Sequence, residues 1–289
     1  MFKAINSEYL APTNGKFKLK DFSTKPQKNA PKKKECKKLL IDQIEILDDL
    51  QKRLYAEDCW SVLVVFQAMD AAGKDSTIRA CMSGLNPAWC QVFSFKSPSK
   101  EELDHDFLWR CYKCLPERGR IGVFNRSYYE ECLVVRVHSE ILQKQKLPKA
   151  IDKKSIWQDR FESIKNFERH LALNGTAIIK FWLNVSREEQ HERFLSRLDT
   201  PEKNWKFEPR DIEESTHWNK YMKAYEDVVK ETSKPWAPWY VIPADSKPYM
   251  RYQVAKILAE SLEKLNPEFP IVKKDVKAKF DEMREKLIV

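Results

Sequence analysis

A short run near residue 70 has the composition of a phosphate-binding loop. After an apolar stretch, segment 67–77 reads QAMDAAGKDST and continues into a helical pattern. A turn at Gly73 would direct backbone N–H groups towards an anion, the next helix N-terminus adds the positive end of its dipole, and Lys74 adds a charge. The segment departs from GxxxxGK[ST], because Ala68 replaces the first glycine and Asp75 replaces the hydroxyl residue. Phosphate binding is therefore predicted from the physics of the loop.

Two carboxylates in the same loop predict a metal ion. Asp70 and Asp75 would repel each other and a bound phosphate unless a cation lay between them, and carboxylates are good ligands for Mg²⁺. We therefore expect both to bind Mg²⁺, with Mn²⁺ as the alternative ion. The competing interpretation is a capped strand-to-helix turn with an exposed lysine. That interpretation leaves unexplained why a strand, a turn, a Gly-Lys pair and a helix coincide.

Five short apolar runs alternate with helical patterns along the chain. The expected strands cover 60–66, 92–95, 121–124, 177–183 and 239–242. The expected helices cover 35–58, 99–115, 155–174, 186–197, 211–232 and 247–265, and serine–glutamate capping boxes open the second and the fourth. This alternation predicts one α/β domain with a parallel five-stranded sheet and helices on both faces. Ligands bind beyond the carboxyl ends of such strands, where the phosphate loop lies.

Most of the net charge lies at the N-terminus. The 289 residues carry 52 Lys and Arg against 43 Asp and Glu, a net charge of +9. Residues 1–34 hold nine lysines and two acids, so they contribute +7 and the other 255 residues only +2. We expect 1–34 to be a flexible, solvated arm before a single domain at 35–289. No apolar run approaches the ~20 residues of a membrane span, and no signal peptide is recognisable.

Cysteine usage indicates a reducing compartment. Seven cysteines, an odd number, predict free thiols in a cytoplasmic protein. Cys111 and Cys114 form a single CxxC with no second pair, so buried or incidental thiols are favoured over a zinc or redox site. None of the five histidines has the spacing of a metal motif, and a histidine-based metal enzyme therefore has no support.

Several motifs together resemble the polyphosphate kinase 2 family. They are segment 67–77, SFKSPS (94–99), FNRSYYE (124–130), NWKF (204–207) and APWYVIPAD (237–245), in this order between about residues 35 and 265. The loop and the NRSxYE part look most like class III members, which use inorganic polyphosphate to phosphorylate nucleoside mono- and diphosphates. The resemblance implies a three-layer P-loop kinase fold near thymidylate kinase, a helical lid at about 187–215, and homo-oligomers of two or four chains.

The resemblance also implies which residues form the site. Asp70, Lys74 and Arg126 would be catalytic. The phosphate- and polyphosphate-binding residues would be Ala71, Ala72, Gly73, Lys74, Asp75 and Ser76 in the loop, and Arg193, Arg197, Lys203 and Lys206 in the lid. The nucleotide-binding residues would be Lys96, Arg110, Asn125, Arg126, Ser127 and Glu130.

The residues themselves leave some of these roles open. Arg126 follows a strand end, and its planar fork could bridge donor and acceptor phosphates, although a structural ion pair is the alternative. Glu130 lies four residues later and could pair with Arg126 or contact the nucleotide. The basic residues of the lid are matched by as many acids, so a salt-bridged surface helix is the alternative for that region.

Three functions remain open from the sequence. The favoured one is Mg²⁺-dependent, reversible transfer from inorganic polyphosphate to AMP and ADP, giving ADP and ATP. The second keeps the fold but uses ATP to phosphorylate a nucleoside monophosphate. The third is a non-enzymatic protein that binds a polyanion or nucleic acid through its basic arm. No nucleic-acid-binding motif appears, so neither nucleic acid nor membrane is an expected partner. A chain donor needs cations beyond those that hold the three phosphates of ATP, and the lid offers them.

Overall fold

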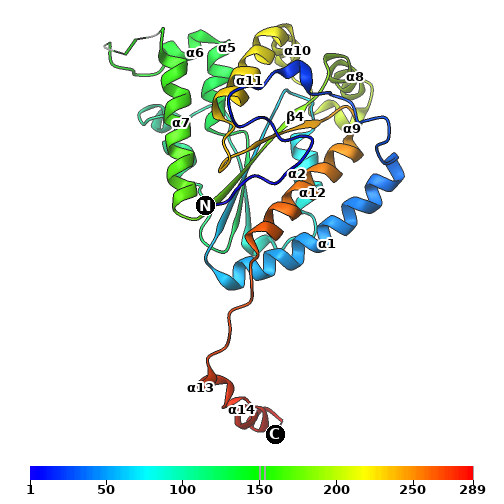
Figure 1. Cartoon of the computed structure of the whole chain (residues 1–289). Coiled ribbons are helices and arrows are strands. Elements are labelled where there is room, and N and C mark those ends of the chain that lie inside the picture. Colours follow the sequence, from blue (N-terminus) through cyan, green and yellow to red (C-terminus); the bar gives the residue numbers. More distant parts are fainter. Residues whose placement is uncertain (150, 153, 289) are drawn as a thin grey trace.

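The strands form one parallel sheet. The computed structural model describes residues 1–149, 151–152 and 154–288 (Figure 1). The strands are β1 (Ser61–Ala68), β2 (Cys90–Ser94), β3 (Ile121–Asn125), β4 (Thr176–Asn184) and β5 (Trp239–Pro243). They pair in the order β2-β3-β1-β4-β5, and every pair is parallel. The expected five-stranded α/β sheet is confirmed.

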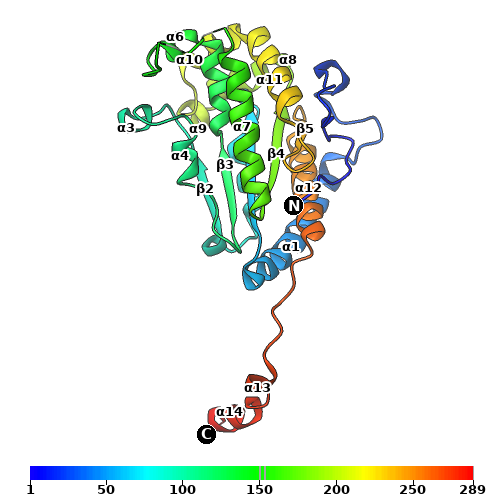
Figure 2. The same cartoon turned by 60° about the vertical axis from the view of Figure 1, so that its left-hand side comes forward.

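Helices cover both faces of this sheet. The α-helices are α1 (Lys33–Glu57), α2 (Lys74–Met82), α3 (Lys100–Leu103), α4 (Trp109–Tyr112), α5 (Val134–Val137), α6 (Ser139–Gln143), α7 (Ile156–Leu173), α8 (Arg187–Leu198), α9 (Pro201–Asn204), α10 (Pro209–Thr216), α11 (Trp218–Thr232), α12 (Lys247–Leu265), α13 (Lys274–Lys277) and α14 (Phe280–Leu287). Helix α12 packs against α1, α2 and β5, whereas α7 packs against β4 and α11 (Figure 2). The result is the three-layer arrangement that the sequence predicts.

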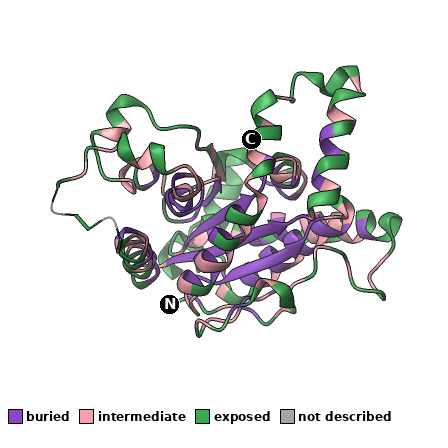
Figure 3. Ribbon diagram, turned by 90° about the horizontal axis from the view of Figure 1, so that it is seen from above, coloured by how far each residue is buried: buried purple, intermediate pink, exposed green. Residues whose placement is uncertain are grey.

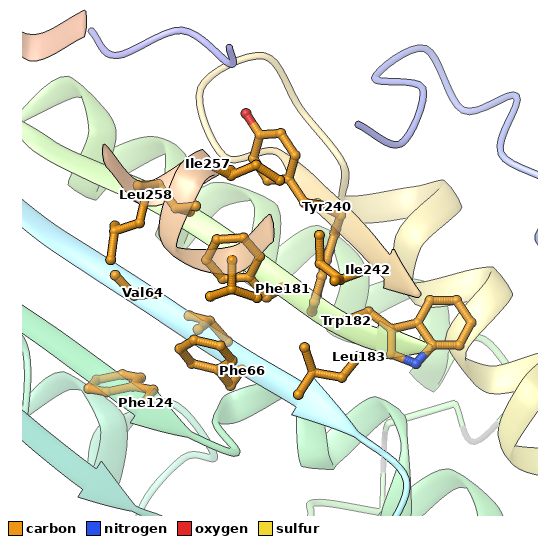
Figure 4. Packing of buried hydrophobic residues seen from close by; sticks show 14 of the residues in the cluster. Val64, Phe66, Phe124, Phe181, Trp182, Leu183, Tyr240, Ile242, Ile257 and Leu258 are labelled. Carbon is orange, nitrogen blue, oxygen red and sulfur yellow. The ribbon is translucent and has the colours of Figure 1, made fainter. Parts of the chain in front are cut away.

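The core lies between the central strands and α12. Every residue of β1 and β4 is buried, as strands covered on both faces require. Phe66 stacks on Phe181 at a centroid distance of 5.3 Å, and Phe181 lies 5.9 Å from Tyr240 on the next strand. Ile257 and Leu258 of α12 cover this row of rings (Figure 4). The rigid sheet that results fixes the positions of the strand ends.

Two expected helices are broken. The stretch 99–115 forms α3 and α4, because the side chain of Asp106 accepts a hydrogen bond from the N–H of Leu108 and stabilises a turn between them. The stretch 211–232 forms α10 and α11, separated at His217. Ser215 and Thr216 donate their hydroxyls to carbonyls three residues back at this break. Local side-chain bonds therefore end helices that the apolar pattern would continue.

The two predicted capping boxes have different outcomes. The box at Ser99 and Glu102 is confirmed, with both reciprocal bonds present. At α8, the Ser186 hydroxyl accepts a bond from the N–H of Glu189, but the N–H of Ser186 donates to Asp245 instead. The start of α8 is therefore tied to the segment that follows β5.

The N-terminal segment is not the solvated arm that its charge predicts. Phe2, Ile5, Tyr9 and Phe17 are buried in the core. The backbone also pairs with the edge strand β5, where Leu10 forms an antiparallel bridge with Tyr240. The prediction was wrong because the lysines dominate the composition, whereas the widely spaced apolar residues between them determine the packing. The segment covers an edge of the sheet that would otherwise expose unpaired backbone groups.

We predict that deletion of residues 1–22 destabilises the whole domain. Burial of one large apolar side chain contributes about 1.5–3 kcal/mol, and domains have only about 5–15 kcal/mol of unfolding free energy. Thermal unfolding and the soluble yield would measure the effect. Deletion of residues 268–289, measured at a concentration at which the chain is monomeric, is the matched control, since every residue from 268 to 288 is exposed and this segment extends away from the body in Figure 1. An unchanged melting temperature after the N-terminal deletion would contradict the prediction.

One ion pair lies within the core. Lys180 on β4 and Glu168 on α7 are 2.6 Å apart and almost fully buried. The carboxylate of Glu168 also accepts bonds from the hydroxyls of Tyr128 and Tyr129, and Lys180 donates to the carbonyl of Thr232. Burial lowers the pKa of Lys180 to about 8, even though Glu168 opposes the shift. This network ties α7 and the segment after β3 to the sheet.

We predict that Lys180→Met lowers the free energy of unfolding by about 3–5 kcal/mol, because Glu168 would remain as an uncompensated buried charge. The double variant Lys180→Met with Glu168→Leu should recover most of that loss. Urea denaturation followed by circular dichroism would measure both. A single variant within about 1 kcal/mol of the wild type would contradict this account of the pair.

In the part of the chain that the structure describes, no helix combines the length and apolarity needed to cross a bilayer.

Candidate functional site

A cleft with a volume of about 1770 Å³ opens at the carboxyl ends of the strands. Its walls come from the loop after β1, the segments after β2 and β3, and the lid helices α8 and α10. In Figure 3 the strands are buried, while the helices around them carry their exposed residues outwards. Every residue predicted for the site lines this cleft except Ala72, which is fully buried.

The loop after β1 has the backbone of an anion site. Gly73 has φ +108° and Ala71 has φ +59°, both in the left-handed region that disfavours a side chain. Helix α2 begins at Lys74, so its N-terminus faces the loop. The hydroxyl of Ser76 donates to the carbonyl of Gly73 at 3.0 Å. The predicted turn at Gly73 is therefore present.

Lys74 folds back over the loop. Its Nζ donates to the carbonyl of Ala68 at 2.7 Å, and the carbonyl of Met69 lies at 3.5 Å. Burial and the nearby charge of Arg126 lower the pKa of Lys74, while Asp70 and two other carboxylates oppose the shift. A partly desolvated ammonium gains strongly from a phosphate anion, because its present partners are neutral carbonyls.

Arg126 connects the loop with the segment after β3. Its Nη2 lies 3.1 Å from Oδ1 of Asp70, and its Nη1 lies 4.0 Å from Oε2 of Glu130. Burial alone would lower the pKa of Arg126. The negative charges of Glu130 and Asp70 outweigh this effect, so the pKa of Arg126 is raised. Burial raises the pKa of Glu130, against the effect of Arg126 and Lys74. Arg126 also has φ +64°, a strained conformation of the kind found at functional sites.

Asn125 and Ser127 flank Arg126 and have different environments. Asn125 donates from Nδ2 to Asp75 at 2.5 Å and to Ser94 at 3.3 Å. The hydroxyl of Ser127 is buried and accepts bonds from the Gln67 amide at 3.1 Å and from the N–H of Tyr129 at 3.2 Å. Asn125 thus orients a loop carboxylate, whereas Ser127 stabilises the turn that positions Arg126.

The two cations expected near the acceptor lie after β2. Lys96 is exposed, and its carbonyl accepts a bond from Nη2 of Arg110 at 2.6 Å. Arg110 also pairs with Glu102 at 3.4 Å and lies over the ring of Phe95. Arg110 is therefore held in place at the cleft wall.

Arg193, which is predicted to bind polyphosphate, lines the cleft but directs its guanidinium to the backbone of the phosphate loop. Its side chain is only 7% exposed and donates to the carbonyls of Ala71, Ala72 and Ala244 and to Glu189. The prediction came from the resemblance of this region to the family's lid, whose basic side chains bind polyphosphate. The i,i+4 spacing with Arg197 does not reveal that the phosphate loop packs against this face of α8.

Of the other three basic lid residues, Lys203 and Lys206 are exposed and Arg197 is partly buried. Arg197 pairs with Asp211 at 2.9 Å, and Lys203 donates to the hydroxyl of Ser196 at 2.9 Å. The ammonium of Lys206 lies over the ring of Trp205, which is 78% exposed. The contacts of Lys203 and Lys206 are weak surface interactions that a polyanion could replace, whereas the pair between Arg197 and Asp211 is mostly buried.

The sequence interpretation missed several cleft residues. Gln190 donates from Nε2 to the carbonyl of Asp70 at 2.9 Å, one helical turn from Arg193. Lys247 adds a further cation to the cleft wall. The helical spacing of Gln190 and Arg193 could have placed both on one face, but nothing in the sequence shows that the face meets the loop.

The carboxylates of the site fit Mg²⁺. Among the residues that the structure describes, no three His, Cys, Asp or Glu side chains form a metal-binding group. Asp70 and Asp75 line the cleft on the phosphate loop. Mg²⁺ is usually bound by one or two carboxylates, with substrate phosphates and waters completing its octahedron, so two carboxylates suffice. The cysteines are free, and Cys111 is buried, as predicted.

Comparisons with known proteins agree with this site. The family model for polyphosphate kinase 2 (PPK2) matches residues 29–270. The ADP-polyphosphate phosphotransferase of Rhodopseudomonas palustris is 52% identical over 257 residues, which cover 89% of each chain. The AMP/ADP-polyphosphate phosphotransferase of Meiothermus ruber is 46% identical over 224 residues, 78% of this chain and 80% of that protein. The crystal structure of polyphosphate kinase 2 from Arthrobacter aurescens TC1 matches with a TM-score of 0.86 and 34% identity, covering 98% of this chain and 99% of that one. The chain belongs to the polyphosphate kinase 2 family.

Proposed function

We propose that this protein transfers phosphoryl groups reversibly from inorganic polyphosphate to AMP and ADP. The observation that carries the proposal is the continuity of one cleft from the phosphate loop to the lid. Lys74, Asp70 and Arg126 lie at one part of its wall, and Arg197, Lys203 and Lys206 continue it. A long polyanion can reach from the loop to the lid cations and be neutralised along its whole length, beyond the three phosphates of ATP. The relatives named above support the same donor and acceptors.

The chain's own residues supply positioning and charge. Phosphoryl transfer requires the attacking and leaving oxygens in line and neutralisation of the charge on the transferred group. Lys74 and the loop N–H groups would hold the donor phosphate. Arg126 would turn its fork from Asp70 towards donor and acceptor phosphates, while Glu130 stays beside the other nitrogen of the guanidinium. Mg²⁺, held by Asp70 and Asp75, would add neutralising charge on the phosphate oxygens.

We also propose a cytoplasmic homo-oligomer of two or four chains. The C-terminal segment supports association, because Ile271, Phe280, Met283 and Leu287 are exposed on it. Exposed apolar side chains gathered on one segment commonly mark a contact with another protein surface.

The proposal is tested by product formation without ATP. The purified protein is incubated with polyphosphate, AMP and Mg²⁺, and nucleotides are separated by anion exchange over time. ADP should appear first and ATP after it, and EDTA should stop both. Formation of neither ADP nor ATP would refute the proposed function. If ATP with AMP gave ADP while polyphosphate gave none, the ATP-dependent kinase would be the better description.

A further inference from the structure

Helix α8 holds the outer side of the phosphate loop. Gln190 donates to the carbonyl of Asp70 at 2.9 Å, and Nη1 of Arg193 donates to the carbonyls of Ala71 at 3.1 Å and Ala72 at 2.6 Å. Three successive carbonyls of the loop are thus bound by two side chains that lie one helical turn apart.

These bonds determine where the loop amides point. In a planar trans peptide the C=O and the N–H point in opposite directions. With the carbonyls of Asp70 and Ala72 turned to α8, the N–H groups of Ala71 and Gly73 point away from it. Neither N–H has a hydrogen-bond partner within the described part of the chain, whereas the N–H of Ala72 donates to Met69. Two amides are therefore oriented and left without a partner, as an anion site requires.

The bonds also explain the strained backbone. Ala71 has φ +59°, a conformation that an alanine adopts only when its surroundings impose it. The carbonyl groups on either side of this residue are those that Gln190 and Arg193 bind. Loss of either side chain would let Ala71 relax and would turn the amides away from the donor phosphate.

Arg193 has little capacity left for a ligand. Four of its five N–H groups are used, since Nε donates to Glu189 at 2.7 Å and Nη2 donates to the carbonyl of Ala244 at 2.6 Å. Its exposure of 7% contrasts with the accessible Lys203 and Lys206. The N–H of Ser186 at the start of α8 also donates to Asp245 at 2.8 Å. Helix α8 is therefore hydrogen-bonded both to the phosphate loop and to Ala244 and Asp245, which follow β5.

We propose that Gln190 and Arg193 are positioning residues, which shape the phosphate loop for the donor and make no contact with polyphosphate. This inference rests on the proposed function. The lid then has an anchored part, which includes Gln190 and Arg193, and a second part in which the cleft-lining Arg197, Lys203 and Lys206 would contact polyphosphate.

The kinetic test compares variants of both parts. Arg193→Lys keeps the charge but loses the fork, and Gln190→Ala removes a neutral group. Both should lower kcat, by roughly 100-fold and 10-fold, because small misplacements of reacting groups have effects of that size. The decrease in kcat should be equal with tripolyphosphate and with long polyphosphate.

Lys206→Ala should instead raise KM for long polyphosphate by more than for tripolyphosphate. His191→Ala, exposed on the same helix, is the control.

Hydrogen exchange provides a second readout that a general loss of stability would not reproduce. In Gln190→Ala and Arg193→Lys, exchange should rise in peptides that cover 68–74 and stay unchanged in those that cover β4. A length-dependent rise in KM for Arg193→Lys, with kcat and loop exchange unchanged, would overturn the inference, and so would unchanged kinetics and exchange in both variants. If the wild type proved inactive with polyphosphate, the proposed function would fail, while the exchange result would still decide whether these residues shape the loop.

Discussion

Replacement of Lys74 by alanine is expected to lower kcat/KM for polyphosphate by about 10³-fold or more, because one oriented donor at a developing charge contributes about 10²–10³ and a full charge contributes more. Lys74 lies at the loop with its ammonium on backbone carbonyls, so the substitution leaves no buried charge unpaired. The melting temperature should therefore change little. Initial rates of ATP formation from ADP, measured by luciferase luminescence, would give the loss.

A matched control lies on the same helix. Arg79 is exposed on α2 and does not line the cleft, so Arg79→Ala removes one positive charge at nearly the same sequence position without touching the site. Its activity should stay close to that of the wild type. If Lys74→Ala retained activity similar to Arg79→Ala, the assignment of the phosphate loop would be wrong.

Arg126→Lys is expected to lower kcat by about 100-fold although the charge is retained. The planar fork of Arg126 reaches Asp70 and points its other nitrogen towards Glu130. An ammonium is a point charge and cannot bind two groups in that geometry. Lysine should tolerate the backbone at φ +64° no worse than arginine does, so the effect reports the side chain.

The comparison between Arg126→Lys and Arg126→Ala separates charge from geometry. The alanine variant should lose a further factor of about 10 or more. Steady-state rates at saturating polyphosphate and AMP would measure both, with circular dichroism as the test of folding. An Arg126→Lys variant with the kcat of the wild type would show that the fork is not needed, and a folded Arg126→Ala variant with that kcat would show that Arg126 serves only as a structural ion pair.

The fold was predictable because its signals are local and agree with one another. Each strand of the sheet is a short apolar run, and the five alternate with helical patterns. The third expected helix, 155–174, ends where predicted, because Gly175 follows α7 with φ +86°, a conformation typical of the residue after a helix. The helix breaks at Asp106 and His217 were not predictable. The apolar residues keep helical spacing across both positions, but hydrogen bonds from a few polar side chains end the helices there.

The centre of the site was also predictable, because it lies within a few residues of strand ends. Lys74 follows β1 and Arg126 follows β3, and β1 pairs with β3, so adjacency in the sheet brings them together. The role of Arg193 was not predictable, since it depends on the packing of α8 against a loop about 120 residues earlier in the chain. The packing of the N-terminal segment on β5 depends on a still longer separation, as between Ile5 and Tyr240.

Labelled polyphosphate tests most directly whether polyphosphate is the phosphoryl donor. The protein is incubated with ³²P-labelled polyphosphate, unlabelled AMP and Mg²⁺, without ATP, and the ADP formed is isolated. We predict that the label appears in the β-phosphate of ADP in the wild type and is nearly absent with Lys74→Ala. Unlabelled nucleotides after complete incubation of an intact wild-type protein would contradict transfer from polyphosphate.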